Sequence, residues 1–164
     1  MNIPMTLNGE RVIVQAPADA PLISVLRAQK CLSVKTGCEQ GVCGSCTVLL
    51  NGKPVPACKI PAAFAAHQSI ETLEHFLRAD WYSDVLRGFS KAGIKLCGYC
   101  NAGKIFAARQ IIQSRHKPSR KDVMEQVRGL SPCCTDLDSL IDGILFAVEI
   151  YNNRKKNDHA GTRT

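Results

Sequence analysis

The pattern of apolar and polar positions changes character midway along the chain. In the first half, short apolar runs are separated by turn-forming residues, as is typical of strands. Two of the turns are Asn-Gly pairs, Asn8-Gly9 and Asn51-Gly52. Such a pair between apolar runs favours a tight hairpin, because both residues tolerate positive φ. The predicted strands cover residues 3–7, 11–14, 47–50, 53–58 and 69–73.

One helix is predicted between the two hairpins. Leu22, Val25 and Leu26 recur at helical spacing after Pro21, and proline suits the first turn of a helix. Two hairpins and one helix predict a small mixed sheet with a helix packed across it.

In the second half the apolar residues recur every three or four positions, which indicates amphipathic helices. The shorter predicted faces are Trp81, Val85, Leu86 and Phe89, and then Ile105, Ala108, Arg109 and Ile112. The longest face contains Leu137, Leu140, Ile141, Ile144, Leu145, Val148 and Tyr151. Between them, Ser119 and Asp122 predict a capping box at a helix start. This half therefore predicts a bundle of about four helices.

Together the two halves predict an α+β protein, with the change of pattern at residues 62–78. We place a strand-rich domain at residues 1–74 and a helical domain at residues 75–153. The polar, basic segment 154–164 is expected to be a disordered tail.

Composition and charge narrow the classes of protein. An apolar content of 45% with 21% charged residues fits a globular protein. The first residues lack the features of a signal peptide and no apolar run approaches about 18 residues, so we expect a cytoplasmic protein without a membrane segment. The net charge of +7 indicates first a solvated surface and a frayed basic end, with an acidic partner surface as the alternative. We expect no nucleic-acid binding, because no aromatic residues are interleaved with the basic ones.

The chain has nine cysteines, which in a reducing compartment favour metal or redox chemistry over disulfides. Four have the spacing Cys38-x4-Cys43-x2-Cys46, followed after eleven residues by Cys58. This is the plant-type spacing for a [2Fe–2S] cluster. Cys31 stands apart and is expected to be an ordinary buried thiol.

The glycines around these cysteines fit the same interpretation. A two-iron cluster needs four thiolates in a small volume, so the loop that supplies three of them must wrap closely around it. Gly37, Gly41 and Gly44 permit that approach. A zinc site more often uses two CxxC-like pairs. A thioredoxin-like pair of Cys43 and Cys46 would need a βαβ unit, which the pattern lacks.

The run SVKTGCEQGVCGSCTVLLNGKPVPAC resembles the iron–sulfur subunits of the molybdenum hydroxylase family, which includes xanthine dehydrogenase, carbon monoxide dehydrogenase and aldehyde oxidoreductase. The resemblance covers nearly the whole chain, including Thr72 to Glu74 and Gly93 to Cys100. It implies a β-grasp, plant-type ferredoxin-like first domain. It also implies a four-helix-bundle second domain that carries another [2Fe–2S] cluster.

By this resemblance the second cluster is held by Cys97, Cys100, Cys133 and Cys134. Cys97 and Cys100 match the family's C-G-x-C pair. The second pair departs from the family's C-x-C, because Cys133 and Cys134 are adjacent, and neighbouring side chains of an extended segment point apart. Three outcomes stay open: an intact cluster of unusual geometry, another metal such as zinc, or no metal.

No phosphate-binding loop or catalytic set is visible, so we expect no catalytic residue on this chain. The resemblance implies the electron-transfer subunit of an oxidoreductase complex. Its electrons would pass from a molybdenum–pterin centre on a large subunit towards FAD, commonly on a medium subunit, or another acceptor. A free-standing [2Fe–2S] ferredoxin-type carrier and a scaffold subunit that has lost its second cluster remain as alternatives. The substrate of the complex lies on another chain and is not visible in this sequence.

Overall fold

The computed structural model describes residues 1–114, 116–130 and 134–161. The chain forms two compact units. The sheet unit comprises Met1–Leu77 and Gly98–Phe106, and the helical unit comprises Arg78–Cys97 and Ala107–Thr164. The domain bounds predicted from the sequence stay a prediction.

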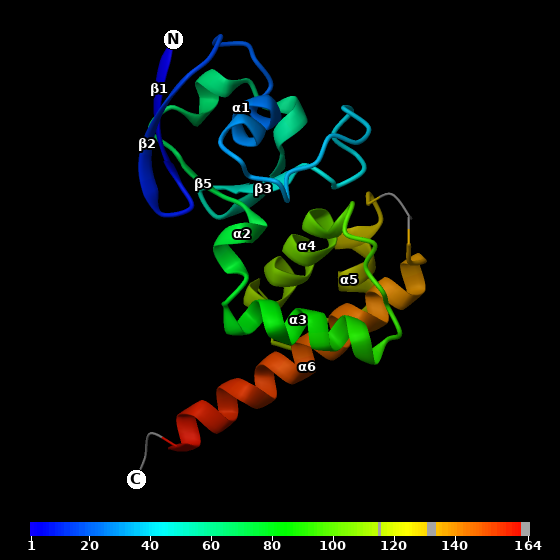
Figure 1. The fold of residues 1–164 in the computed structure, drawn as a ribbon. Helices are drawn as coiled ribbons and strands as arrows, with labels where there is room; N and C mark the ends of the chain where they lie inside the picture. The colour runs from blue at the N-terminus through cyan, green and yellow to red at the C-terminus, as the bar shows by residue number, and fades with distance from the viewer. Residues whose placement is uncertain (115, 131–133, 162–164) are drawn as a thin grey trace. The chain divides into compact units, whose positions relative to one another are not determined.

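The sheet unit contains one mixed sheet of five strands (Figure 1). Their bounds are β1 Asn2–Leu7, β2 Glu10–Gln15, β3 Thr47–Leu50, β4 Lys53–Pro56 and β5 Ser69–Glu71. The order across the sheet is β2-β1-β5-β3-β4, in which β1 and β5 are parallel and the other neighbours antiparallel. Helix α1 (Leu22–Ala28) packs on the sheet, so an α+β arrangement is confirmed.

Both Asn-Gly hairpins are confirmed. Asn8 and Gly9 have φ of +52° and +89°, and Asn51 and Gly52 have +50° and +78°. The Asn8 side chain also links the first hairpin to the end of β5: its Oδ1 accepts a 2.8 Å hydrogen bond from the Thr72 N–H.

Two predicted strands are shorter in the structure. β4 ends at Pro56, and Cys58 lies on a 3₁₀ turn, η1 (Ala57–Lys59). β5 ends at Glu71, because the next N–H, that of Thr72, bonds to a turn side chain instead of a strand. Leu73 then starts the short helix α2 (Leu73–Phe76). A second 3₁₀ turn, η2, covers Ala62–Ala65.

The core of the sheet unit lies between α1 and the sheet. Its fully buried members include Ile3, Leu22, Leu26, Val48 and Ile70. Cys31 is part of this core and only 4% exposed, and burial raises the pKa of its thiol. The prediction of an ordinary buried cysteine is confirmed.

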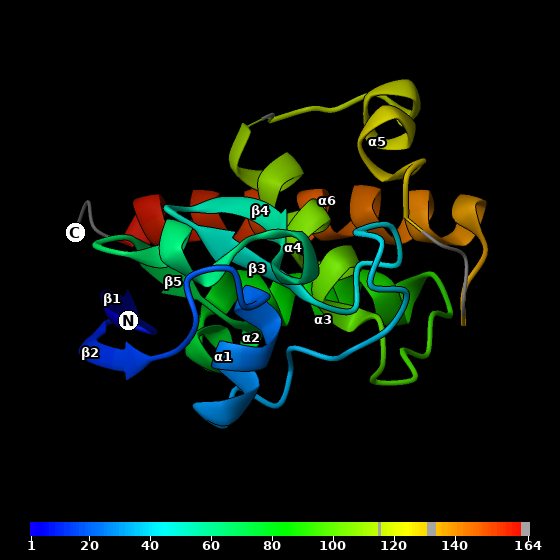
Figure 2. The ribbon, with the colours of Figure 1, turned by 90° about the horizontal axis from the view of Figure 1, so that it is seen from above.

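The helical unit is built from α3 (Asp80–Lys91), the later part of α4 (Asn101–Ser114), α5 (Arg120–Val127) and α6 (Leu137–Gly161). In the described residues this matches the prediction of about four helices. α3 and α6 lie side by side (Figures 1 and 2). Their backbones approach closely, since a Cβ on Gly88 would lie 2.4 Å from the Ala147 nitrogen.

The predicted apolar faces are correct only in part. Val85 and Phe89 are buried, but Leu86 is 38% exposed, because the side of α3 that faces α6 is centred on Gly88. Leu137, at the start of α6, is also exposed. In the helix between, the capping box of Ser119 and Asp122 is confirmed.

The predicted disordered tail is wrong for residues 154–161, because α6 continues to Gly161. Arg154 explains part of this extension. Its guanidinium lies 2.8 Å from the carboxylate of Asp84 on α3, and Asp84 is 2% exposed. It also lies over the Tyr151 ring, one turn earlier on α6.

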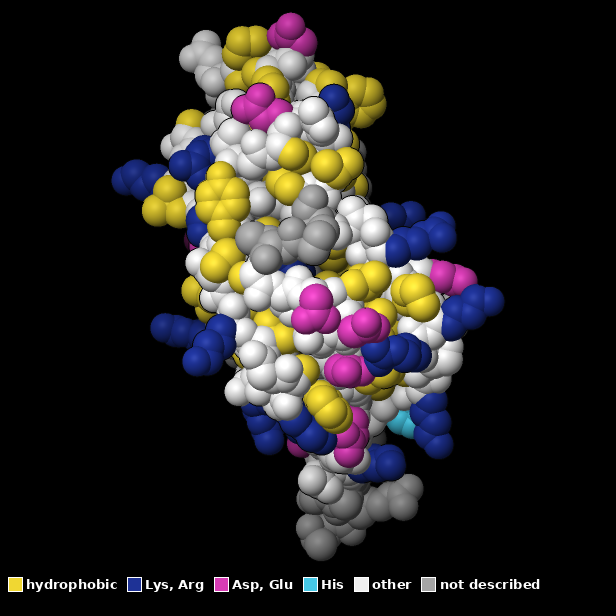
Figure 3. Space-filling view, turned by 90° about the vertical axis from the view of Figure 1, so that its right-hand side faces the viewer, with side chains coloured by type: hydrophobic (Ala, Val, Ile, Leu, Met, Phe, Trp, Pro, Cys, Tyr) yellow, Lys and Arg dark blue, Asp and Glu magenta, His cyan; other side chains and the backbone are white. Residues whose placement is uncertain are grey.

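Charged side chains of both signs share the surface. On the face drawn in Figure 3, Lys and Arg are spread among Asp and Glu. In the helical unit, Arg120 pairs with Asp138 and Asp142. In the part of the chain that is described, no helix has the length and apolarity needed to cross a membrane.

Candidate metal centres

The first candidate centre is the loop between α1 and β3, which leaves the sheet as an irregular segment (cyan in Figure 1). Its backbone amides point at sulfur atoms. The Sγ of Cys38 accepts hydrogen bonds from the N–H groups of Gln40 (3.3 Å) and Cys43 (3.4 Å). The Sγ of Cys43 accepts one from the Cys38 N–H, at 3.4 Å. Such a ring of amides stabilises negative charge on sulfur.

The electrostatics of Cys38 follow from these contacts. The amides of Gln40, Cys43 and Val42 lower the pKa of its thiol to about 6, because a hydrogen bond to the thiolate favours the charged form. Cys38 is therefore ready to act as a thiolate ligand at neutral pH.

Cys46 and Cys58 are brought together by the hairpin of β3 and β4. Thr47 faces Pro56 in the register of the hairpin, and the Ala57 N–H donates to the Cys46 carbonyl at 3.1 Å. Cys58 therefore lies beside Cys46. Cys46 is 3% exposed, and burial raises the pKa of its thiol to about 11. The first candidate set therefore has one buried cysteine, Cys46, and three that are partly exposed to water.

Close approach explains two of the loop glycines. A Cβ on Gly37 would lie 2.7 Å from the Cys43 Sγ. Gly44 has a φ of +78° and contacts the first turn of α4, where the Gly103 N–H donates to its carbonyl at 3.0 Å. A Cβ on Gly103 would lie 2.8 Å from the Gly44 Cα. The loop is therefore docked on α4 through backbone atoms that tolerate no side chain between them.

Residues 33–36, which precede the loop, are held by hydrogen bonds to Glu74 and to the turn at residues 98–99. Glu74 accepts hydrogen bonds from the Ser33 N–H (2.6 Å) and from its hydroxyl. The Lys35 ammonium donates to the Gly98 carbonyl, and the Tyr99 hydroxyl donates to the Thr36 carbonyl. Residues 33–36 therefore hold the turn that precedes Cys100.

The second candidate centre involves the later cysteines. The Sγ atoms of Cys97 and Cys134 lie within 4.8 Å of each other, and both residues are exposed. Cys134 comes just before Asp136, which caps α6 by accepting the Ser139 N–H at 2.8 Å. Cys133 lies outside the described residues.

Cys100 is the buried member of this set, 4% exposed. A turn precedes it, in which Gly98 has a φ of +86° and donates its N–H to Asn101 at 3.1 Å. The ammonium of Lys104 lies 2.7 Å from the Cys100 Sγ. Lys104 was not predicted from the sequence. The available signal was a single charge in the otherwise apolar run 102–108, four positions after a cysteine.

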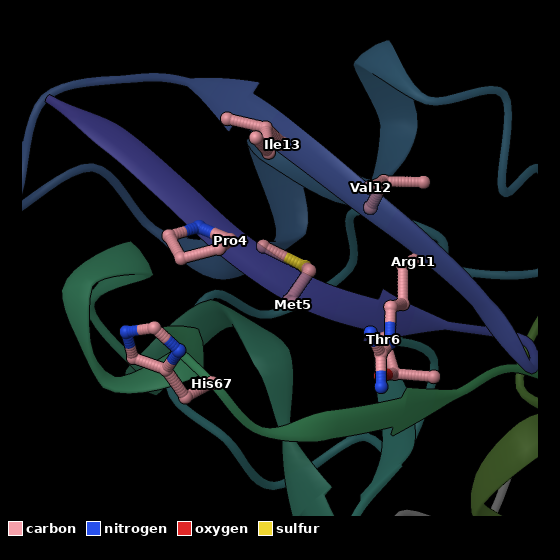
Figure 4. A pocket seen from close by; sticks show the side chains of 7 residues that line it. All are labelled: Pro4, Met5, Thr6, Arg11, Val12, Ile13 and His67. Carbon is pink, nitrogen blue, oxygen red and sulfur yellow. The ribbon is translucent and has the colours of Figure 1, made fainter.

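A pocket beside the first hairpin is lined by Met5, Arg11, Ile13 and His67 among others (Figure 4). None of the candidate ligands lines it. Thiolates that receive amide hydrogen bonds, as the sulfur of Cys38 does, are the donor set that iron–sulfur clusters use.

Comparison with protein families gives two matches that together cover most of the chain. Residues 5–73 match the family described as "2Fe-2S iron-sulfur cluster binding domain". Residues 70–145 match the family described as "[2Fe-2S] binding domain".

Individual relatives agree with these matches. The xanthine dehydrogenase iron–sulfur-binding subunit of Escherichia coli O157:H7 is 36% identical, over 88% of this chain and 92% of that protein. The nicotine 6-hydroxylase small subunit of Paenarthrobacter nicotinovorans is 32% identical, over 94% and 93%. Among solved structures, quinoline 2-oxidoreductase from Pseudomonas putida 86 gives a TM-score of 0.83 at 33% identity, covering 93% of this chain and 96% of that chain. The chain therefore belongs to the family of iron–sulfur, electron-transfer subunits of the molybdenum hydroxylases.

Proposed function

We propose that this chain carries two [2Fe–2S] clusters and relays single electrons from a molybdenum–pterin centre on a large subunit towards FAD on a medium subunit, or another acceptor. The observation that carries the proposal is the ring of backbone amides around Cys38 and Cys43. A structural thiol needs no such donors, whereas a cluster ligand gains stability from them.

The first cluster would be held by Cys38, Cys43, Cys46 and Cys58. A bound [2Fe–2S] cluster takes up and releases one electron at a time. The residues of the loop prepare the site for the cluster. They favour the thiolate form of Cys38, bring the sulfur atoms together and limit the access of water to Cys46.

The second cluster would be held by Cys97, Cys100, Cys133 and Cys134. In support, Cys97 and Cys134 are already close, and Cys100 is joined to Cys97 through only two residues. A zinc site or a site without metal remains the competing outcome for this set.

The partners are proposed from the relatives. Two of them are named as the small or iron–sulfur-binding subunit of an oxidoreductase. We propose that this chain assembles in the same way, in the cytoplasm, where a reducing environment keeps its thiols free. Copurification of the tagged chain with a molybdenum protein from its native host tests this. Isolation of a stable, fully loaded chain without partners would favour a free-standing carrier.

The clusters are tested by measuring iron and acid-labile sulfide per chain, together with low-temperature EPR of the reduced protein. We expect about four irons and two rhombic signals. Two irons and one signal would mean that the second set does not hold a cluster. Zinc in place of iron at the first set would contradict the whole proposal.

Single substitutions then assign the signals. Cys43→Ser is expected to abolish or alter one signal, and Cys100→Ser the other. Cys31→Ser is the matched control, because Cys31 is a buried thiol that contributes to the core and to neither set. It should leave both signals intact. Survival of both signals in Cys43→Ser would refute the ligand assignment.

A further inference from the structure

Lys104 is a buried cation whose position the electron-transfer function alone does not explain. Its residue is 2% exposed, and its ammonium donates to the Cys100 Sγ at 2.7 Å. The same stretch of α4 is otherwise apolar, with Ala102, Ile105 and Phe106 buried around it. Lysine is almost never buried to this degree unless it is paired.

The pairing partner of Lys104 is sulfur. Among the described residues, no carboxylate lies within ion-pair distance of its ammonium. A buried ammonium without a counter-charge is strongly unfavourable. The sulfur of Cys100 accepts a hydrogen bond from Lys104, so the lysine and the cysteine are buried as a pair.

The helix makes this contact a fixed one. Cys100 directly precedes α4 and Lys104 lies one turn later, so the two side chains stand on the same side of the helix. The adjacent residue Gly103 packs against the Gly44 backbone and donates its N–H to the Gly44 carbonyl, which holds this turn of α4 in place. The helix therefore holds the ammonium beside the sulfur.

We propose that Lys104 is a positioning residue that raises the reduction potential of the cluster bound by Cys100. The proposal rests on the second cluster of the proposed function. A cluster held by four thiolates gains negative charge when it takes up an electron. A fixed positive charge at a ligand sulfur stabilises this reduced form more than the oxidised form. Net charge and hydrogen bonds to sulfur are among the factors that set such potentials.

The test is an EPR-monitored redox titration of the full chain with three variants of Lys104. Lys104→Met removes the charge and the donor, Lys104→Gln removes only the charge, and Lys104→Arg keeps both. Lys91→Met is the matched control, since Lys91 is exposed and pairs with Glu149 on the helical unit. Iron and sulfide are measured on every sample.

For Lys104→Met we expect the ratio of reduced to oxidised second cluster, at a fixed potential, to fall about tenfold. For a one-electron couple this is a shift of about 59 mV to lower potential. Lys104→Gln should shift in the same direction, and Lys104→Arg should stay close to the parent chain. The first cluster and the Lys91→Met control should not move.

The outcomes separate the two proposals. If the parent chain shows two signals and no Lys104 variant shifts either, the tuning role is wrong and the proposed function stands. If the parent chain shows only the first cluster, the second site fails and the role of Lys104 fails with it. If Lys104→Met loses the second cluster, a lowered potential in Lys104→Gln still supports the proposal. Loss of that cluster in Lys104→Arg as well would overturn it.

Discussion

Because Gly103 has no Cβ, the loop at residues 37–46 can pack directly against the first turn of α4. The backbone of the loop at Gly44 fills the space that a Cβ on Gly103 would need. We expect Gly103→Ala to push the loop away, to destabilise the chain by about 1–3 kcal/mol and to weaken the EPR signal of the first cluster. Gly129→Ala is the matched control, since nothing lies within 4 Å of its added Cβ. Equal free energies of unfolding for the two variants would show that the loop can move to accommodate the added Cβ without a loss of stability.

Glu74 should make the stability of the segment at residues 33–36 depend on pH, because its carboxylate accepts hydrogen bonds from Ser33. Burial by itself raises the pKa of Glu74, but hydrogen bonds from Ser33 and Thr72 outweigh it and hold the pKa below its usual range. A carboxylate with a lowered folded-state pKa stabilises the fold above its unfolded pKa of about 4.3, and this contribution is lost as the pH falls through the folded value.

We therefore expect Glu74→Gln to lower the free energy of unfolding by about 1 kcal/mol at neutral pH. The difference from the parent chain should shrink as the pH falls below about 4. Denaturant unfolding at several pH values measures it, with Glu10→Gln on the exposed start of β2 as the control. A difference that persists unchanged in acid would contradict the role of the charge.

At the scale of elements, α3 and α6 are joined by small residues and by one buried charge. Arg154 on α6 reaches Asp84 on α3, and Asp84 is nearly inaccessible to water. Truncating one member of a buried pair leaves the other without its counter-charge.

We expect Arg154→Ala to lower the free energy of unfolding by about 3 kcal/mol and to fray the end of α6. Arg120→Ala is the comparison, because its pairs with Asp138 and Asp142 are exposed and such pairs contribute about 0–1 kcal/mol. Thermal or denaturant unfolding ranks the two variants. The opposite ranking would be inconsistent with a structural role for Asp84.

The elements also show why sequence predicted some features and missed others. The turns at Asn8 and Asn51 depend on local φ preferences, so they were predictable. The helical end at Arg154 depends on Asp84, far away in sequence, and the composition of residues 154–164 alone favoured disorder. Leu86 was placed on the wrong face because the contact surface of α3 is set by Gly88, a residue that carries no apolar signal.

The same limit applies to the candidate site. Spacing alone predicted Cys38, Cys43, Cys46 and Cys58, because one loop and one hairpin supply them. Lys104 was missed because its partner is a sulfur atom, and helical periodicity gives no reason to bury a charge.

At the scale of the whole molecule, we expect loss of the proposed clusters to affect some segments more than others. The core of α3 and α6 is held by its own packing, whereas the segments at residues 37–46 and 97–104 would lose the clusters proposed to bind there. We expect iron removal to lower the thermal midpoint and to speed hydrogen exchange mainly in those two segments. Hydrogen-exchange mass spectrometry of loaded and stripped chain measures this. Equal loss of protection throughout α3 and α6 would indicate that the clusters support the entire fold.

The strand order has a consequence for the behaviour of the isolated chain. The two edges of the sheet are β2 and β4. Pro54 and Pro56 leave β4 with few N–H groups to offer an incoming strand. β2 has no proline and exposes Ile13. Any added strand would therefore pair with β2 rather than β4, and a proline or lysine introduced into β2 would oppose such pairing.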